Sequence, residues 1–117
     1  MQKTIIELPN GLNAEVEIKR FRAHIIHSPK AKGDIIIPKF VDYESKKYLV
    51  ISIDQESFSD NHLTKSISFP EKSSVRNIEI GAFSRSSISR FFIPASLETL
   101  NEMWCCYSSN LFQIEFL

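Results

Sequence analysis

The sequence has few of the residues that crosslink small proteins or cradle phosphate. Its 117 residues include only two cysteines, Cys105 and Cys106, and three isolated glycines, Gly11, Gly33 and Gly81. Adjacent thiols are poorly placed for an ordinary disulfide bond and fit neither a secreted disulfide framework nor a paired zinc motif. The isolated glycines rule out a glycine-rich phosphate loop. The core must therefore form by apolar burial alone, and a reducing compartment is the default expectation.

The chain also lacks an excess of charge and any long hydrophobic run. Fourteen basic residues balance fourteen acidic ones, so no field of the whole molecule would recruit nucleic acid or an acidic membrane. No apolar run approaches the roughly 20 residues needed to span a bilayer. Glu7 and Pro9 interrupt the region where a signal peptide would need its apolar stretch. These absences predict no membrane span and make the cytoplasm the default compartment.

What the sequence does contain is a repeat. Three segments share two apolar positions three residues apart and a third position five residues later; they are residues 50–53 with Phe58, residues 75–78 with Phe83, and residues 97–100 with Cys105. Each leads to a second apolar stretch, namely Leu63 with residues 67–69, Ile88 with residues 91–93, and Leu111 with residues 114–116. Phe69 to Ile93 is 24 residues and Ile93 to Phe116 is 23. Agreement at several positions predicts a repeat protein of one domain.

The second stretch has the L-x-x-L-x-L spacing of leucine-rich repeats, with one extra residue in its first copy. Its end alternates, which predicts a short strand whose alternate side chains enter the core. The residues predicted to point inward are Phe91, Ile93, Ile114 and Phe116, and those predicted to point outward are Phe92 and Glu115. Proline directly after a strand ends it because proline cannot donate to the ladder. Pro38, Pro70 and Pro94 mark these ends.

Ile-Pro pairs, V-x-x-I segments and an Ala-Phe pair recur in order along residues 33–117. The segments are residues 35–38 (Ile-Ile-Ile-Pro), 48–53 (Tyr-Leu-Val-Ile-Ser-Ile), 82–88 (Ala-Phe-Ser-Arg-Ser-Ser-Ile) and 93–100 (Ile-Pro-Ala-Ser-Leu-Glu-Thr-Leu). This order resembles the BspA-like leucine-rich repeats found in surface antigens of anaerobic bacteria and parasitic protists. The chain departs from the family pattern where Asp54, Glu79 and Asn101 replace glycine, Ser57 replaces alanine, and Trp104-Cys105 replaces Ala-Phe.

We therefore expect a mainly β repeat solenoid. The expected fold is a right-handed leucine-rich repeat stack of about 3.5 units of 22–25 residues over residues 34–117, with a β-hairpin cap over residues 1–33. Single units of this length cannot bury their own apolar face, so neighbouring units supply the core. The predicted inner column is Ile67, Phe91 and Ile114. The cap is predicted from apolar residues that alternate with polar ones on both sides of Lys19 and Arg20.

No constellation of residues indicates catalysis, a metal or a cofactor. His24 and His27 lie three positions apart, which on a strand directs their side chains to opposite faces. His62 lies in a predicted turn and is interpreted as a surface residue. Cys105 occupies the register of an aromatic core residue and is interpreted as a small core residue. Since no G-x-S-x-G elbow occurs either, we predict no catalytic residue, no metal site and no cofactor.

The outward side chains of the stacked strands form the candidate binding surface. One predicted row is Ile36, Ser68, Phe92 and Glu115, and the flanking row is Asp34, Ser66, Arg90 and Gln113. The predicted partner-binding residues are Ser66, Ser68, Arg90, Phe92, Gln113 and Glu115, with Arg90 and Phe92 at the centre because arginine and aromatic residues often anchor interfaces. The competing interpretation is that a loop covers Phe92 and that Arg90 is simply solvated.

Three hypotheses about partners follow. The first is a non-catalytic protein-protein interaction module that binds an unknown protein through the strand face, and the resemblance implies an adhesive or surface-antigen role, since the family is often at the cell surface. The second is a nucleic-acid-binding domain that uses Lys19, Arg20, Phe21 and Arg22, although zero net charge and the narrow basic cluster disfavour it. The third concerns the last predicted strand, whose uncovered edge indicates self-association or a longer array.

Overall fold

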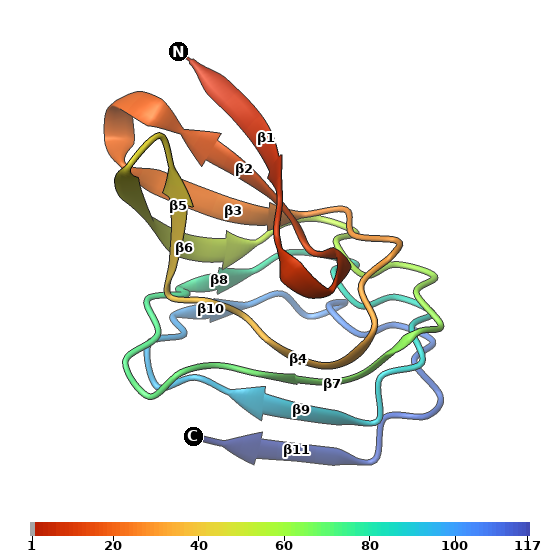
Figure 1. Cartoon of the computed structure of the whole chain (residues 1–117). Coiled ribbons are helices and arrows are strands. Elements are labelled where there is room, and N and C mark those ends of the chain that lie inside the picture. The colour runs from red at the N-terminus through yellow and green to blue at the C-terminus, as the bar shows by residue number, and fades with distance from the viewer. Residues whose placement is uncertain (1) are drawn as a thin grey trace.

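The computed structural model describes residues 2–117, which wind into two facing β-sheets (Figure 1). The strands are β1 (Lys3–Glu7), β2 (Asn13–Glu17), β3 (Arg22–Ile26), β4 (Gly33–Ile36), β5 (Phe40–Tyr43), β6 (Lys46–Ile53), β7 (Thr64–Ser68), β8 (Asn77–Ile78), β9 (Arg90–Ile93), β10 (Thr99–Leu100) and β11 (Gln113–Phe116). Sheet A has seven strands in the order β1-β2-β3-β6-β8-β10, with β5 pairing β6. Sheet B has four strands in the order β11-β9-β7-β4.

The four parallel strands of sheet B mark successive turns of a solenoid. Their register pairs Ile35 with Ile67, Ile67 with Phe91, and Phe91 with Ile114. The predicted inner column is therefore one aligned row on neighbouring strands. The repeat solenoid expected from the sequence is confirmed.

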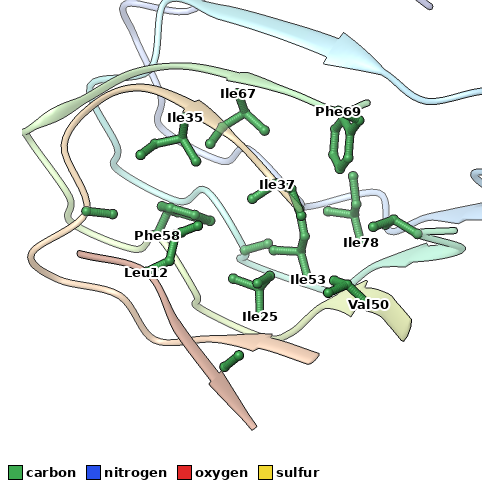
Figure 2. Packing of buried hydrophobic residues seen from close by; sticks show 14 of the residues in the cluster. Leu12, Ile25, Ile35, Ile37, Val50, Ile53, Phe58, Ile67, Phe69 and Ile78 are labelled. Carbon is green, nitrogen blue, oxygen red and sulfur yellow. The ribbon is translucent and has the colours of Figure 1, made fainter. Parts of the chain in front are cut away.

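The core lies between the two sheets and is filled by side chains from every turn. Figure 2 shows Ile35 and Ile67 of sheet B facing Ile25 and Ile53 of sheet A, and all four are fully or almost fully buried. Each such side chain contributes roughly 1.5–3 kcal/mol when it leaves water. Because neighbouring turns supply both walls of this core, no single turn is stable alone.

An aromatic stack fills the core along the turns that join the sheets. The rings of Phe58 and Phe83 are parallel within 3° with centroids 4.9 Å apart. The Trp104 ring meets Phe83 edge-on, with centroids 5.9 Å apart and planes inclined by 84°, and its centroid lies 4.7 Å from that of Phe91. The Phe83 amide donates to the Trp104 carbonyl at 2.7 Å, so Trp104, and not Cys105, is hydrogen-bonded to Phe83 through the backbone, and the indole fills the core. Stacked phenylalanine rings stabilise the core beyond the burial of their surface area, because aromatic rings prefer this relative geometry.

The first turn is longer than the later ones. Ile35 and its partner Ile67 are 32 positions apart, whereas Phe91 follows Ile67 by 24. The additional residues form the β5–β6 hairpin, in which Glu44 and Ser45 have φ values of 50° and 66°. Two positive φ angles at the tip are typical of a tight hairpin turn. This hairpin was not predicted from the sequence.

The N-terminal segment extends sheet A beyond the first turn. β2 and β3 form an antiparallel hairpin around a short 3-10 helix, Ile18–Arg20. β1 adds a third antiparallel strand, and β3 pairs in parallel with β6, which joins this segment to the solenoid. Ala14 and Val16 of β2 are fully buried, as the predicted alternation requires. The division of the chain at residue 33 stays a prediction.

The last turn corrects one expectation. Ile114 and Phe116 were expected to enter the core, but their side chains are 49% and 84% exposed. Their register partners Phe91 and Ile93 are 0% and 8% exposed. The reason is that β11 is the edge strand of sheet B, so its side chains have a neighbouring turn on one side only. Correct register therefore did not guarantee burial.

The turns after sheet A place their left-handed residue two positions later than the replaced glycine of the family pattern. Positive φ values occur at Glu56 (59°) and Gly81 (67°), whereas Asp54 and Glu79 have none. The backbone at these two positions is not left-handed, so a residue with a side chain fits there without strain. The departures from the family pattern leave the solenoid intact.

Candidate interaction surface

The structure brings the six predicted partner-binding residues onto one sheet, sheet B. The register pairs Asp34 with Ser66, Ser66 with Arg90, and Arg90 with Gln113, so one row crosses all four strands. The same register pairs Ile36 with Ser68 and Phe92 with Glu115 in the second predicted row. Residues opposite one another in a ladder point to the same face. The two rows thus lie next to each other on the face away from the core.

Several polar side chains of these rows are already hydrogen-bonded. The Ser66 hydroxyl is buried and donates to Asp34 Oδ1 at 2.7 Å. Gln113 Nε2 donates to Glu115 Oε1 at 2.7 Å along β11. Ser66 therefore orients a carboxylate on the neighbouring turn, while the exposed carboxamide and carboxylate of β11 hold each other in place.

The centre of the surface combines a free cation with partly exposed apolar groups. Arg90 is exposed, and its guanidinium makes no ion pair or hydrogen bond with any residue between 2 and 117. Phe92, on the same strand, is half-buried, whereas Ile36, on the edge strand β4, is 64% exposed. Arg90 is thus exposed to solvent and Phe92 is partly covered. Whether these two residues bind a partner stays a prediction.

A partly buried polar network, which was not predicted from the sequence, joins the N-terminal strands to the first turn. His24 Nε2 lies 2.5 Å from Glu17 Oε2, and His24 Nδ1 lies 2.6 Å from Ser52 Oγ. The Ser52 hydroxyl donates to Asp54 Oδ1 at 2.6 Å. The hydrogen bond from His24 holds the pKa of the buried Glu17 carboxyl below its ordinary value. Glu17 and His24 are on adjacent strands of the predicted hairpin, so strand register was the signal that could have paired them.

The other two histidines of the chain also have hydrogen-bond partners, which come from distant parts of the sequence. His27 Nδ1 lies 3.1 Å from the carbonyl oxygen of Glu56, and His62 Nδ1 lies 3.0 Å from Ser87 Oγ. No group of three or more metal-ligating side chains occurs within residues 2–117. Cys105 is partly buried against the core, and burial raises the pKa of its thiol. A raised pKa lowers the thiolate fraction and hence the reactivity of Cys105.

In the basic segment of the second hypothesis, two residues are exposed to solvent and two contact neighbouring side chains. Lys19 and Arg20 are exposed on the 3-10 turn. Arg22 Nε lies 3.5 Å from Glu17 Oε2, and Phe21 stacks on Tyr48.

Among residues 2–117, no helix is long and apolar enough to cross a membrane.

Comparisons with known proteins agree with this architecture. The family described as "BspA type Leucine rich repeat region (6 copies)" matches residues 41–117. A crystal structure of a leucine-rich repeat protein from Bacteroides capillosus has a TM-score of 0.64 at 16% identity, covering 97% of this chain and 98% of that chain. The pneumococcal vaccine antigen PcpA has a TM-score of 0.59 at 17% identity, covering 97% of this chain and 38% of that chain.

No match was found among curated proteins. At these identities the two solved structures show a shared fold, and PcpA is much longer than the region matched here. The family match covers well over half of the chain and the whole solenoid after β4. The chain therefore belongs to the BspA-type leucine-rich repeat family.

Proposed function

We propose that this chain is a non-catalytic protein-protein interaction module that binds its partner through the outward face of sheet B. The family is consistent with a protein-interaction module, and leucine-rich repeat folds are typically non-catalytic binding scaffolds. The observation that carries the proposal is the row formed by Asp34, Ser66, Arg90 and Gln113 across four parallel strands. Side chains on paired strands hold fixed spacings, so they offer an ordered surface to a partner.

The expected anchors are Arg90 and Phe92. The Arg90 guanidinium has no competing partner among the described residues, so a carboxylate of a partner can form a two-pronged hydrogen bond with it. Phe92 supplies apolar area on the same strand, and the exposed Ile36 supplies more on β4, beyond β7. Arginine and aromatic side chains are the commonest energetic anchors of interfaces. Ser66, Ser68, Gln113 and Glu115 then form the polar surroundings.

The test is a pull-down from extracts of the source cells with the immobilised chain. The double variant Arg90→Ala/Phe92→Ala should lose the captured protein. A matched control is Arg76→Ala/Ile80→Ala, which removes one exposed arginine and one exposed apolar residue near β8 in sheet A. Capture that persists in the first variant would remove sheet B from the proposal.

A surface-antigen or adhesive role is a narrower proposal. PcpA is described as a vaccine antigen, and the family resemblance points to surface-associated proteins. If this chain acts there, an antibody raised against it should label intact source cells, and mild protease treatment of those cells should remove the signal. Labelling only after the cells are opened would contradict the role.

Self-association through β11 is a second proposal about partners. β11 pairs with β9 on one side only, and Ile114, Phe116 and Leu117 are exposed beside its free edge. Unpaired strand edges recruit further strands. Size-exclusion chromatography with light scattering should show a dimer that Ile114→Lys disrupts. A strictly monomeric wild-type chain would contradict this proposal and leave binding through sheet B intact.

A further inference from the structure

We propose that two copies of this chain join through β11, with the two strands antiparallel and centred on Ile114, so that both copies of sheet B form one continuous sheet. This inference rests on the proposed self-association and names the arrangement that it takes. Four strands from each copy contribute to the joined sheet. A two-fold axis perpendicular to the sheet leaves both outward faces on the same side. The dimer therefore presents two copies of the row that contains Arg90 on one surface.

The free edge of β11 offers backbone groups to a further strand. The Gln113 amide donates to the Ser89 carbonyl at 3.2 Å, so this residue faces β9. Alternate residues of a strand direct their N–H and C=O groups to opposite neighbours, which places those of Ile114 and Phe116 on the other side. Among residues 2–117, no strand pairs with β11 on that side (Figure 1). The edge is therefore ready to accept a strand.

The side chains along this edge are apolar and uncovered. Ile114 and Phe116 are 49% and 84% exposed, and Phe112, directly before the strand, is 77% exposed. Ile114 and Phe116 share the register of the buried Phe91 and Ile93, so they belong to the core side of the sheet. Contiguous exposed apolar groups mark sites of association. A second strand beside β11 covers them from the side on which a neighbouring turn covers Phe91.

The ends of the two sheets differ in how well they can receive a strand. At the other end of sheet B, the Lys32 amide donates to the Asn10 carbonyl at 3.2 Å, which places the Pro9–Gly11 turn beside the start of β4. In sheet A, β10 has only two residues, and β1 carries the charges of Lys3 and Glu7. Short or charged edge strands resist pairing. The edge best suited to pair with β11 is therefore β11 of a second copy.

Two-fold symmetry and charge select the register. In a symmetric antiparallel pair, one residue lies opposite its own copy. A pair centred on Glu115 would set two carboxylates directly opposite each other, which is destabilising. A pair centred on Ile114 sets Gln113 opposite Glu115 of the second copy instead. Because the backbone groups of Ile114 face the free edge, the two copies of Ile114 can exchange both of their hydrogen bonds.

The side chains on both faces of this junction are complementary. Gln113 Nε2 donates to Glu115 Oε1 at 2.7 Å within the strand, so the same donor and acceptor can bond across the junction, twice by symmetry. On the core side the two Ile114 side chains meet. Each Phe116 lies diagonally from Ile114 of the other copy, a position within reach of an aromatic side chain. The junction thus has polar pairs outside and apolar pairs inside, as the rest of sheet B does.

The test is disulfide cross-linking between copies in a Cys105→Ala/Cys106→Ala background, which removes both native thiols. Gln113→Cys and Glu115→Cys chains, one of them with a mass tag, are mixed, oxidised and examined by non-reducing electrophoresis and mass spectrometry. The mixture should form heterodimers, because directly opposite residues have Cα atoms within disulfide range. Each chain alone should form fewer dimers, because its cysteines lie diagonally apart in this register.

The matched control is a mixture of Asp34→Cys and Ile36→Cys chains, which carry the cysteines two positions apart on the opposite edge strand, β4. Heterodimers no more abundant than in this control would overturn the arrangement. Dimers of Glu115→Cys alone as abundant as those of the mixture would overturn the register. Circular dichroism of each variant reports whether the fold is kept.

A change of charge at Gln113 gives a second measurement, which needs no cysteine. Gln113→Lys should lower the dissociation constant of the dimer roughly fivefold, because each lysine then faces Glu115 of the other copy. Gln113→Glu should raise it, and equal dissociation constants in the two variants would overturn the register. Light scattering of the wild type separates the failures. A dimer without the mixed cross-link keeps self-association and removes this arrangement, whereas a monomer removes both and leaves partner capture by sheet B intact.

Discussion

Replacing Glu17 by glutamine should weaken the joint between the N-terminal strands and the first turn. The Glu17 side chain is 7% exposed, lies 2.5 Å from His24 Nε2 and 3.5 Å from Arg22 Nε, and belongs to a network that reaches Ser52 on β6. A hydrogen bond to a charged group contributes about 1.5–3 kcal/mol. Glutamine keeps the shape of the side chain and removes the charge. We expect Glu17→Gln to lower the free energy of unfolding by an amount in that range at neutral pH.

The pH dependence of this difference follows from the lowered pKa of Glu17. Its ordinary value of 4.5 describes the unfolded chain, and the folded value lies below it. The unfolded state therefore binds the proton first as the pH falls, so folding loses stability. The contribution of Glu17 is fully present above pH 4.5 and disappears as the pH falls through the folded pKa. Wild type and Glu17→Gln should converge in acid.

The assay is urea unfolding followed by far-ultraviolet circular dichroism, repeated from about pH 7 to about pH 3. Glu15→Gln is a suitable control because Glu15 lies on the same strand and pairs with Lys3 at 3.5 Å in a more exposed position. That pair should contribute less than about 1 kcal/mol. A Glu17→Gln variant as stable as wild type at neutral pH, or a difference that stays constant into acid, would refute the reasoning.

Three further outcomes are expected. Phe83→Ala should cost about 3–5 kcal/mol in urea unfolding because it leaves a cavity between Phe58 and Trp104; a cost below about 1 kcal/mol would contradict the buried stack. Asn61→Ala should cost about 3 kcal/mol in the same assay, because the buried amide donates to the carbonyls of Ser28 and Ala31, and an unchanged midpoint would contradict this. In a Cys106→Ser background, iodoacetamide should alkylate Cys105 more slowly in the folded chain than in urea at the same pH, since burial raises the thiol pKa; equal rates by mass spectrometry would contradict it.

The solenoid was predictable because its signal is carried by spacing. Side chains such as Ile67, Phe91 and Ile114 recur at nearly constant intervals, and parallel strands of successive turns align equal positions. The exposure of Ile114 was not predictable in the same way, since burial depends on a neighbouring turn and not on the residue. A periodic pattern identifies the side chains that can be buried. Whether they are buried depends on a neighbouring turn of the solenoid that covers them.

The N-terminal half was less predictable because it does not repeat. β1 contains adjacent isoleucines, Ile5 and Ile6, so it lacks a clean alternation. The β5–β6 hairpin turns at Glu44 and Ser45, and neither is the glycine or asparagine that usually identifies a tight turn in a sequence. Phe21 stacks on Tyr48 of this hairpin, and this contact between two separate segments arises only in the folded chain.

For the candidate surface on sheet B, the sequence predicts which residues share a row but not which side chains are already hydrogen-bonded. Spacing placed Ser66 and Arg90 in one row, and the register agrees, but spacing cannot say which side chain is already occupied. Ser66 donates to Asp34 from a buried position, whereas Arg90 is exposed. Ser66→Ala should therefore lower stability by about 1 kcal/mol, while Arg90→Ala should leave stability within about 0.5 kcal/mol and weaken partner capture. Paired measurements of urea unfolding and pull-down distinguish the two residues, and the reverse pattern would mean that Arg90 supports the fold and Ser66 contacts the partner.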